Sequence, residues 1–313
     1  MSPKVAVKKM SAPGEISVTC SKTAVCKFLA IAPGELDYVV WQLQKGKAYR
    51  NRPKKKPDGT IRNCQAPIEQ LKNLQRKIVD HILSRVQLSP SAFGGVKNRS
   101  IVKNAQMHVR PDALITLDIE KCFPNIKDHH VRVVFETLGY SGQALSLLVR
   151  VCTLDFALPQ GAPTSPILAN IVLKGIDKRI GALAWKHGGI TTRYVDDIGI
   201  SGPRRLKKMI PLFRRIVKSE GFSINESKTR VMLKGTRQQI TQLLVNEKVN
   251  LPKERIEEIK IHVRALNSQS TERDWNSVSG KVYWVRAVNP HAAAKLVRQF
   301  KKQKSKFYQK LSS

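Results

Sequence analysis

Residues 191–201 read TTRYVDDIGIS and decide the fold, because two adjacent acids interrupt a pattern typical of paired strands. The residues on both sides alternate between polar and apolar, which predicts a β-hairpin around Val195-Asp196-Asp197. The apolar flanks indicate that these strands are half-buried. Two adjacent carboxylates in such surroundings repel each other and lose hydration, so we expect a cation beside them.

A second acidic stretch lies upstream, where residues 113–123 read ALITLDIEKCF and predict a strand over 113–119 that carries Asp118. Carboxylates bind Mg²⁺, and two such ions can clamp the attacking and leaving oxygens of phosphoryl transfer. Successive strand residues face opposite sides, so Asp196 and Asp197 can face one metal pair together only if the turn bends the backbone. We therefore assign Asp196 as the inner partner of Asp118, with Asp197 as a supporting ligand.

The net charge points to the partner. The 313 residues include 56 Lys and Arg against 23 Asp and Glu, which gives +33. The charge is clustered, since residues 45–62 hold eight basic residues and one acid, and residues 275–313 hold no acid. A polyanion explains this excess, and nucleic acid is the expected one. A membrane-surface protein would need an amphipathic anchor, and none stands out, so we expect no membrane partner.

The composition excludes other classes. With 41% hydrophobic residues the chain can build real cores, so it is not a disordered basic tail. No apolar run approaches the roughly 18 residues of a membrane span. The five cysteines are odd in number and form no C-x-x-C pair, which argues against structural zinc and against a disulfide framework. We expect a protein of the reducing cytoplasm.

The remaining periodicities predict an α+β protein whose centre is a small antiparallel sheet. A basic hairpin is expected around Asp58-Gly59, and a short strand over 231–234. Ser165 is the expected N-cap of a helix over 166–180. The other predicted helices cover 36–43, 71–86, 131–138, 144–151, 206–220, the neighbourhood of 253–266, and a segment after Pro290.

Four segments together resemble reverse transcriptases, in the order and spacing of that family. Residues 194–197 (YVDD) resemble its Y-x-D-D box, and residues 158–166 (LPQGAPTSP) its L-P-Q-G-x-x-x-S-P segment. Residues 117–123 (LDIEKCF) are similar to the strand with the first catalytic Asp, and residues 221–229 (GFSINESKT) to a G-x-x-x-N-x-x-K-T segment. The resemblance covers roughly residues 49–266.

This resemblance implies the right-hand polymerase fold, with a small antiparallel palm sheet and a helical thumb. Residues 1–112 would form N-terminal helices and fingers. Residues 113–235 would form the palm, with a fingers segment around 125–160. Residues 236–313 would form the thumb and an RNA-recognition region.

Within the family, the sequence is most similar to bacterial retron enzymes. Residues 93–101 (FGGVKNRSI) and 104–108 (NAQMH) resemble the retron G-x-x-x-x-R-S-I and N-A-x-x-H elements. Group II intron enzymes usually continue into a maturase domain, and the compact length here favours the retron interpretation. One departure stands out: retron enzymes typically carry Val-Thr-Gly after the palm, whereas residues 240–242 read ITQ, with Gln242 in place of the glycine.

The resemblance also implies roles for single residues. The catalytic metal ligands would be Asp118, Asp196 and Asp197, holding two Mg²⁺, with Mn²⁺ as an alternative. Nucleotide contacts would come from Arg62, Lys55 (or Lys56), Phe123, Gln160 and Lys228. RNA contacts would come from His108, Thr241, Asn246, Lys301 and Lys302. For Phe123 the role is a steric gate against the ribose 2′-OH, and the alternative is an ordinary core residue. For Lys228 the alternative is a surface lysine, and for His108 a hydrogen-bonded structural histidine.

The expected activity is therefore that of an RNA-directed DNA polymerase. A cognate structured non-coding RNA would supply both template and primer, and dNTPs would extend an internal guanosine 2′-OH into a branched RNA–DNA. The resemblance further implies anti-phage defence with a separate effector protein. Two alternatives remain: a group II-like or other mobile-element enzyme that uses 3′-OH primers, and a non-catalytic RNA-binding scaffold, which the intact carboxylates disfavour.

Overall fold

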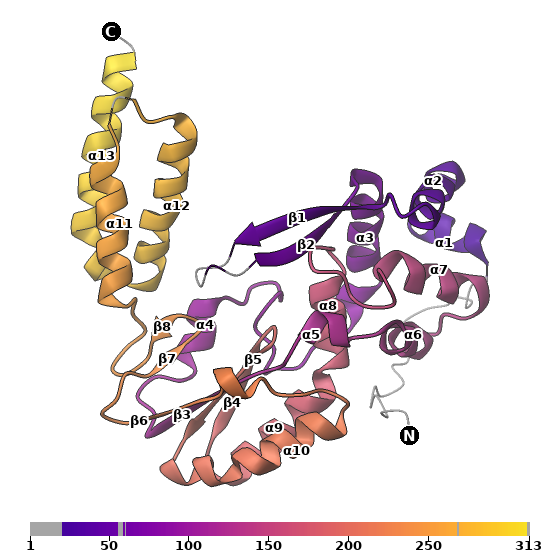
Figure 1. The fold of residues 1–313 in the computed structure, drawn as a ribbon, viewed down its shortest axis with the longest axis horizontal. Coiled ribbons are helices and arrows are strands. Elements are labelled where there is room, and N and C mark those ends of the chain that lie inside the picture. Colours follow the sequence, from indigo (N-terminus) through magenta and orange to yellow (C-terminus); the bar gives the residue numbers. More distant parts are fainter. Residues whose placement is uncertain (1–20, 56–58, 60, 268, 312–313) are drawn as a thin grey trace.

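The computed structural model describes residues 21–55, 59, 61–267 and 269–311. Its centre is a four-stranded antiparallel sheet in the order β4-β5-β3-β6 (Figure 1). The strands are β3 (Ala113–Asp118), β4 (Ile190–Tyr194), β5 (Asp197–Gly202) and β6 (Arg230–Leu233). These are the strands expected from the sequence, and the α+β class is confirmed.

Helices cover one face of this sheet, and the other face, which borders the site, is only partly covered. Helix α9 (Lys174–Lys186) packs on β4, and α10 (Ile210–Ser219) packs on α9, after the 3-10 turn η2 (Arg204–Met209). The single helix predicted over 166–180 is wrong, because Leu173 separates α8 (Ser165–Val172) from α9. Ser165 is the first residue of α8 rather than its cap, and its Oγ donates to the Pro159 carbonyl at 2.7 Å.

Two groups of elements precede β4 outside the palm sheet. Before β3 they are α1 (Lys22–Phe28), α2 (Pro33–Gln44), β1 (Tyr49–Lys55), β2 (Ile61–Pro67), α3 (Glu69–His81), η1 (Leu83–Arg85) and α4 (Ile101–Gln106). After β3 they are α5 (Cys122–Asn125), α6 (Asp128–Thr137) and α7 (Gly142–Cys152), ahead of α8. Strands β1 and β2 pair antiparallel, as the basic hairpin predicts, although Asp58 of its turn lies outside the described residues. One hydrophobic core runs from α3 into the palm and includes Leu71, Ile78, Ile115 and Leu117.

The C-terminal part corresponds to the expected helical thumb. After η3 (Glu226–Lys228) and β6, a small hairpin of β7 (Gln239–Ile240) and β8 (Leu243–Leu244) leads into α11 (Lys253–Ala265), α12 (Glu272–Val288) and α13 (Pro290–Leu311). Helix α12 was not predicted from the sequence. Its Trp275 contacts Phe300 of α13 within a second hydrophobic core.

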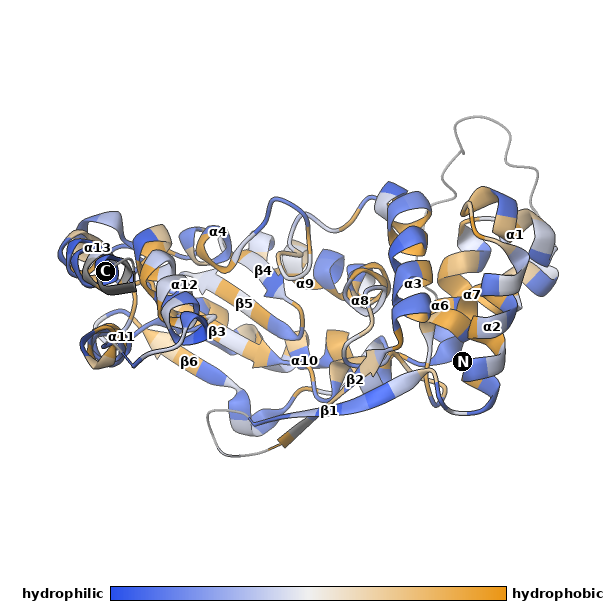
Figure 2. Cartoon of the chain, turned by 90° about the horizontal axis from the view of Figure 1, so that it is seen from above, coloured by the Kyte–Doolittle hydropathy of each residue, from blue (hydrophilic) through white to orange (hydrophobic). Residues whose placement is uncertain are grey.

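The three helices of the thumb lie at one end of the molecule, and α1 and α2 lie at the other (Figure 2). The sheet and the β1–β2 hairpin lie between these ends (Figure 1). Within the described ranges, every helix is too short or too polar to cross a lipid bilayer.

Candidate active site

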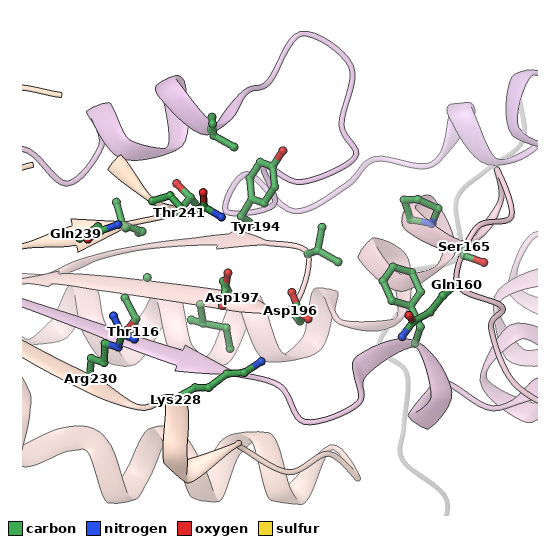
Figure 3. A pocket seen from close by; sticks show the side chains of 18 of the residues that line it. Thr116, Gln160, Ser165, Tyr194, Asp196, Asp197, Lys228, Arg230, Gln239 and Thr241 are labelled. Carbon is green, nitrogen blue, oxygen red and sulfur yellow. The ribbon is translucent and has the colours of Figure 1, made fainter. Parts of the chain in front are cut away.

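A cavity of about 820 Å³ opens on the free side of the palm sheet, where the fingers, the palm and the β7–β8 hairpin meet (Figure 3). Its walls include Cys64 of β2, Phe123 of α5, Gln160 and Thr241. Asp196, Asp197 and Lys228 lie on its palm side. The cavity thus collects residues from segments far apart in the sequence.

Three carboxylates converge at the palm side of this cavity. Asp118 ends β3 and is 6% exposed, and its register partner across the sheet is Asp197, the first residue of β5. Asp196 lies in the two-residue turn between β4 and β5. One carboxylate oxygen from each of the three residues lies within 4.8 Å of the others. The bend that this arrangement requires is present, because Val195 has a left-handed φ of 63°.

The three carboxylates suit a divalent cation. Carboxylate oxygens are hard ligands, and three of them from two adjacent strands offer the donors that Mg²⁺ or Mn²⁺ prefers. The residues present therefore fit a metal-dependent site.

The electrostatics agree with a site that needs a cation. Desolvation by the surrounding protein raises the pKa of Asp197 to about 6, with further contributions from the charges of Asp196 and Asp118. The surface of Asp197 still faces the solvent of the cavity. Lys228 supplies part of the missing charge, since its Nζ donates to Asp118 Oδ1 at 3.1 Å and Oδ2 at 3.0 Å.

The three aspartates in turn change the pKa of Lys228. Partial burial lowers its pKa, but the hydrogen bond to Asp118 and the charges of all three aspartates more than offset this effect, so that the pKa is raised overall. The ammonium group is therefore positively charged at neutral pH. It lies in the cavity beside the carboxylates rather than on a remote surface, where it could meet a phosphate.

The segment from Leu158 to Pro166 joins the fingers to the cavity. The amide of Gln65 in β2 donates to the carbonyl of Gln160 at 2.7 Å. Gly161 has a φ of 136°, and a Cβ there would lie 2.7 Å from the Gln65 carbonyl oxygen, so only glycine fits this junction. Gln160 lines the cavity, as expected for a residue beside a nucleotide.

Phe123 lies between the cavity and the hydrophobic core. It lines the cavity and is half-buried, and it also packs against the core of the fingers and palm. Lys55 ends β1 with an exposed side chain and does not line the cavity. Arg62 pairs with Lys54 in the β1–β2 register, and Lys56 lies outside the described residues.

Two of the residues expected to bind RNA make side-chain hydrogen bonds within the protein. His108 is 1% exposed, and its ring nitrogens lie 2.7 Å from Ser201 Oγ and from Thr192 Oγ1 on the palm strands. Asn246 accepts from the amide of Gln238 and donates to the Thr236 carbonyl. His108 has both ring nitrogens paired and almost no exposed surface, so the structure favours the hydrogen-bonded structural histidine. Asn246 is half-buried, and RNA contact there stays a prediction.

The other three are placed where nucleic acid could reach them. Thr241 lines the cavity from the tip of the β7–β8 hairpin. Lys301 and Lys302 are exposed on α13 of the thumb, away from the cavity walls.

Several residues that line the cavity were not predicted from the sequence. Tyr194 lies within the Y-x-D-D segment, so its position could have been inferred from that motif. Thr116, Arg230 and Gln239 also line the cavity (Figure 3), but nothing in their local sequence marks them.

Comparisons with known proteins give one family and several relatives. Residues 53–275 match the family described as reverse transcriptase (RNA-dependent DNA polymerase). The chain is 32% identical over 262 residues to the retron Ec86 reverse transcriptase of Escherichia coli, covering 81% of this chain and 80% of that protein. It is 33% identical over 268 residues to the retron Mx65 reverse transcriptase of Myxococcus xanthus, covering 79% of this chain and 62% of that protein.

Among solved structures, a foamy viral protease–reverse transcriptase in complex with double-stranded DNA matches with a TM-score of 0.43 and 19% identity, over 82% of this chain and 40% of that one.

Proposed function

Because the chain belongs to the reverse transcriptase family as a retron-type member, and is an RNA-directed DNA polymerase, we propose that it copies a cognate structured RNA into a branched, RNA-linked single-stranded DNA. The RNA would supply both the template and the primer, and the primer would be an internal guanosine 2′-OH. The single observation that carries the catalytic part is the cluster of Asp118, Asp196 and Asp197, two of which, Asp196 and Asp197, line the cavity.

The three aspartates would hold two Mg²⁺ ions. When bound, these ions neutralise charge on the triphosphate and lower the pKa of the attacking hydroxyl. Lys228 lies beside Asp118 and would place a positive charge near the departing pyrophosphate. Gln160 would position the nucleotide, and the aromatic ring of Phe123 would exclude the ribose 2′-OH.

The thumb supports the nucleic-acid part of this proposal. Helix α13 buries Ala293, Leu296 and Phe300 in the core of the thumb. Its exposed residues include Lys295, Arg298, Lys301 and Lys302. A helix with an apolar inner face and a basic outer face suits the phosphates of a structured RNA or of the template–product duplex.

A cellular role follows from the retron membership as part of the same proposal. The RNA–DNA product would act with a separate effector protein in defence against phage. Plating of phage on cells that carry the native locus tests this part. The Asp196→Asn substitution should remove any protection that the wild-type locus gives.

The biochemical experiment uses protein expressed with its native flanking DNA. The purified wild-type protein should carry a discrete short DNA that is covalently joined to RNA. RNase should shorten this species and leave a ribonucleotide stub linked 2′–5′, which a debranching enzyme should release. The Asp196→Asn protein should retain the RNA and lack the DNA, because the substitution removes a metal ligand and no phosphate contact.

Two other results would contradict the proposal. A heterogeneous mixture of nucleic acids, or DNA joined only through 3′–5′ linkages, would favour a mobile-element enzyme that extends ordinary primers. A protein that binds RNA but incorporates no dNTP on any primer would favour the non-catalytic scaffold.

A further inference from the structure

The backbone of the metal-binding turn adopts a conformation that its sequence does not favour. Val195 is β-branched, yet its φ is 63°. A branched side chain in the left-handed region is a true outlier, so it persists only where the surroundings impose it. The surroundings of Val195 therefore determine where the next residue, Asp196, places its carboxylate.

A buried arginine contacts this turn directly. Arg193 is 0% exposed, and its Nη1 donates to the carbonyl oxygen of Val195 at 2.7 Å. The same Nη1 donates to Asn170 Oδ1 at 3.0 Å. Its Nε and Nη2 donate to the two oxygens of Asp177 on α9, at 2.7 and 2.8 Å. The guanidinium thus connects the helix layer behind the sheet to the turn that carries Asp196.

The same network reaches a second segment of the chain. Asn170 Nδ2 donates to the carbonyl of Gly94 at 2.8 Å. A Cβ on Gly94 would lie 2.5 Å from the Val195 amide nitrogen, so this loop presses against the turn from outside. The left-handed residue is held between Gly94 on one side and the guanidinium of Arg193 on the other.

We propose that Arg193 is a positioning residue that sets the metal affinity of the active site by fixing the Val195 carbonyl. This inference rests on the proposed role of the aspartates as metal ligands. An ion pair with Asp177 alone could be kept by many arrangements of Arg193. The additional bond to Val195 transmits the position of the guanidinium to the adjacent Asp196.

The chemistry predicts which substitution separates positioning from simple structural support. Lysine at position 193 keeps a positive charge for Asp177, but a single ammonium cannot bridge both Asp177 oxygens, Asn170 and the Val195 carbonyl at once. The Arg193→Lys protein should therefore fold, and its turn should be free to move. The affinity for metal and kcat should fall, whereas the KM for dNTP should change little.

The test measures Mn²⁺ binding directly, from the electron paramagnetic resonance signal of free Mn²⁺, with the full chain bound to a primer–template. Arg193→Lys should raise the Kd for Mn²⁺ about tenfold or more, and kcat should fall by about 10- to 100-fold, as expected for residues that support metal ligands. Raising the Mn²⁺ concentration should restore part of the lost rate.

The matched control is Arg179→Lys. Arg179 lies on α9, as does Asp177, the partner of Arg193, and it donates to Glu220 at 2.7 Å rather than to the turn. Its substitution should leave both the Mn²⁺ Kd and kcat within about twofold of wild type, because exposed ion pairs contribute little. Asn170→Ser keeps the buried ion pair and should shift both values in the same direction as Arg193→Lys, by a smaller factor; it carries the test if Arg193→Lys fails to fold.

A folded Arg193→Lys protein with wild-type Mn²⁺ affinity would overturn the proposal, and so would one whose Mn²⁺ affinity falls no more than that of Arg179→Lys. The Asp196→Asn protein separates this failure from failure of the metal site itself. If the wild type binds Mn²⁺ no better than Asp196→Asn, the metal assignment is wrong, and the role of Arg193 falls with it.

Discussion

Two tight turns face the same cavity, and they differ in the contacts that the rest of the protein makes with them. The turn that carries Asp196 has a left-handed Val195, held by Arg193 and by the close approach of Gly94. The tip of the β7–β8 hairpin has left-handed φ values of 45° at Thr241 and 66° at Gln242. Within the described structure the buried Oγ1 of Thr241 has no hydrogen-bond partner, and Gln242 is exposed.

The two turns therefore differ in how far surrounding contacts compensate for their backbone strain. In the catalytic turn, buried contacts compensate for the strain, which suits a site whose ligands must keep fixed positions. At the hairpin tip the strain has fewer supports within the chain. We therefore expect substitutions around the catalytic turn to affect the chemical step strongly. We expect substitutions at the hairpin tip to affect stability and nucleic-acid affinity more modestly.

The largest effect should come from the metal ligands. Asp118→Asn and Asp196→Asn should each lower primer extension by at least about 10³-fold, since each removes charge that a metal ion needs, worth several kcal/mol in the transition state. Asp197→Asn should be milder. Single-turnover extension assays measure the rates, and filter binding should show nearly unchanged RNA affinity.

Glu120→Gln is the control for this series, because Glu120 belongs to the same acidic stretch but is exposed and is not part of the cluster of three aspartates. It should keep extension close to the wild-type rate. Equal losses for Glu120→Gln and Asp118→Asn would mean that general charge, rather than metal ligation, explains the effect.

The close approach of Gly94 gives the next test. In Gly94→Ala the new Cβ would lie 2.5 Å from the Val195 nitrogen, so the turn or the loop must shift. Overpacking of this kind costs about 1–3 kcal/mol of unfolding free energy, and we expect extension to fall by about 100-fold. Urea unfolding and initial rates measure both effects.

Gly280→Ala in α12 is the matched control, since a Cβ there meets nothing within 4 Å. It should raise stability by up to about 1 kcal/mol, because alanine favours the helix. The contrast between the two turns would lose its basis if Gly94→Ala retained full activity.

Much of this comparison could be predicted from the sequence, and some could not. The paired strands and the three aspartates follow from short-range alternation and from acids in apolar surroundings. The pairing of Arg193 with Asp177 does not, because it depends on how α9 packs behind the sheet. The same limit applies to Lys228, which is 110 residues from the Asp118 it contacts.

The placement of His108 and the missed helix α12 have different causes. The sequence element around His108 suggested RNA contact, but packing places the ring between two hydroxyls of the palm strands. Helix α12 was missed although its capping box, Thr271 with Asp274, is local and readable. Side-chain partners far along the chain are set by the tertiary fold, whereas element positions are set mostly by local pattern.

His108 also allows the palm to be tested by pH. Burial lowers its pKa to about 4, below the ordinary value near 6.5, so the folded state binds fewer protons than the unfolded state between these values. The stability from His108 is therefore fully present above about pH 6.5 and is lost as the pH falls toward 4. Lowering the pH from 7.5 to 5 should therefore reduce the unfolding free energy by about 2 kcal/mol through His108 alone.

The measurement compares urea unfolding of wild type and His108→Gln at both pH values. The substitution should remove about 2 kcal/mol of the acid-dependent loss, because glutamine does not titrate. His130, whose pKa is also lowered to about 4 by burial, should keep its own contribution in both proteins. His291→Gln changes an exposed histidine of the thumb and should leave the loss as it is in the wild type. If His108→Gln also left it unchanged, protonation of this ring would not contribute to acid unfolding.

Phe123 of α5 tests a part of the cavity wall that lies outside the palm sheet. Phe123→Val should raise the ratio of kcat/KM for rNTP to that for dNTP by about tenfold or more, since a contact that discriminates by shape is worth about 1–3 kcal/mol. Phe222→Val is the control, because Phe222 is 4% exposed in the same core and does not line the cavity. If both variants lose stability and neither changes the ratio, Phe123 is only a core residue.

The smallest effect should come from the hairpin tip, where Gln242 stands at the position of the family glycine. A two-residue turn with positive φ at both positions favours glycine, because other residues pay about 1–2 kcal/mol for the left-handed conformation. Glycine loses more entropy on folding, by about 0.5–1 kcal/mol, so Gln242→Gly should raise the unfolding free energy by about 0.5–1 kcal/mol. Gln242→Ala removes the same side chain without relieving the strain, and it should not stabilise the protein. Urea unfolding of the three proteins measures this difference in stability. RNA-binding assays on the same proteins show whether the Gln242 side chain contributes to RNA affinity. If the two variants are equally stable, the tip is not strained and the contrast between the two turns fails. If both weaken RNA binding by the same factor, the Gln242 side chain contacts the RNA, and its departure from the family pattern exchanges stability for recognition.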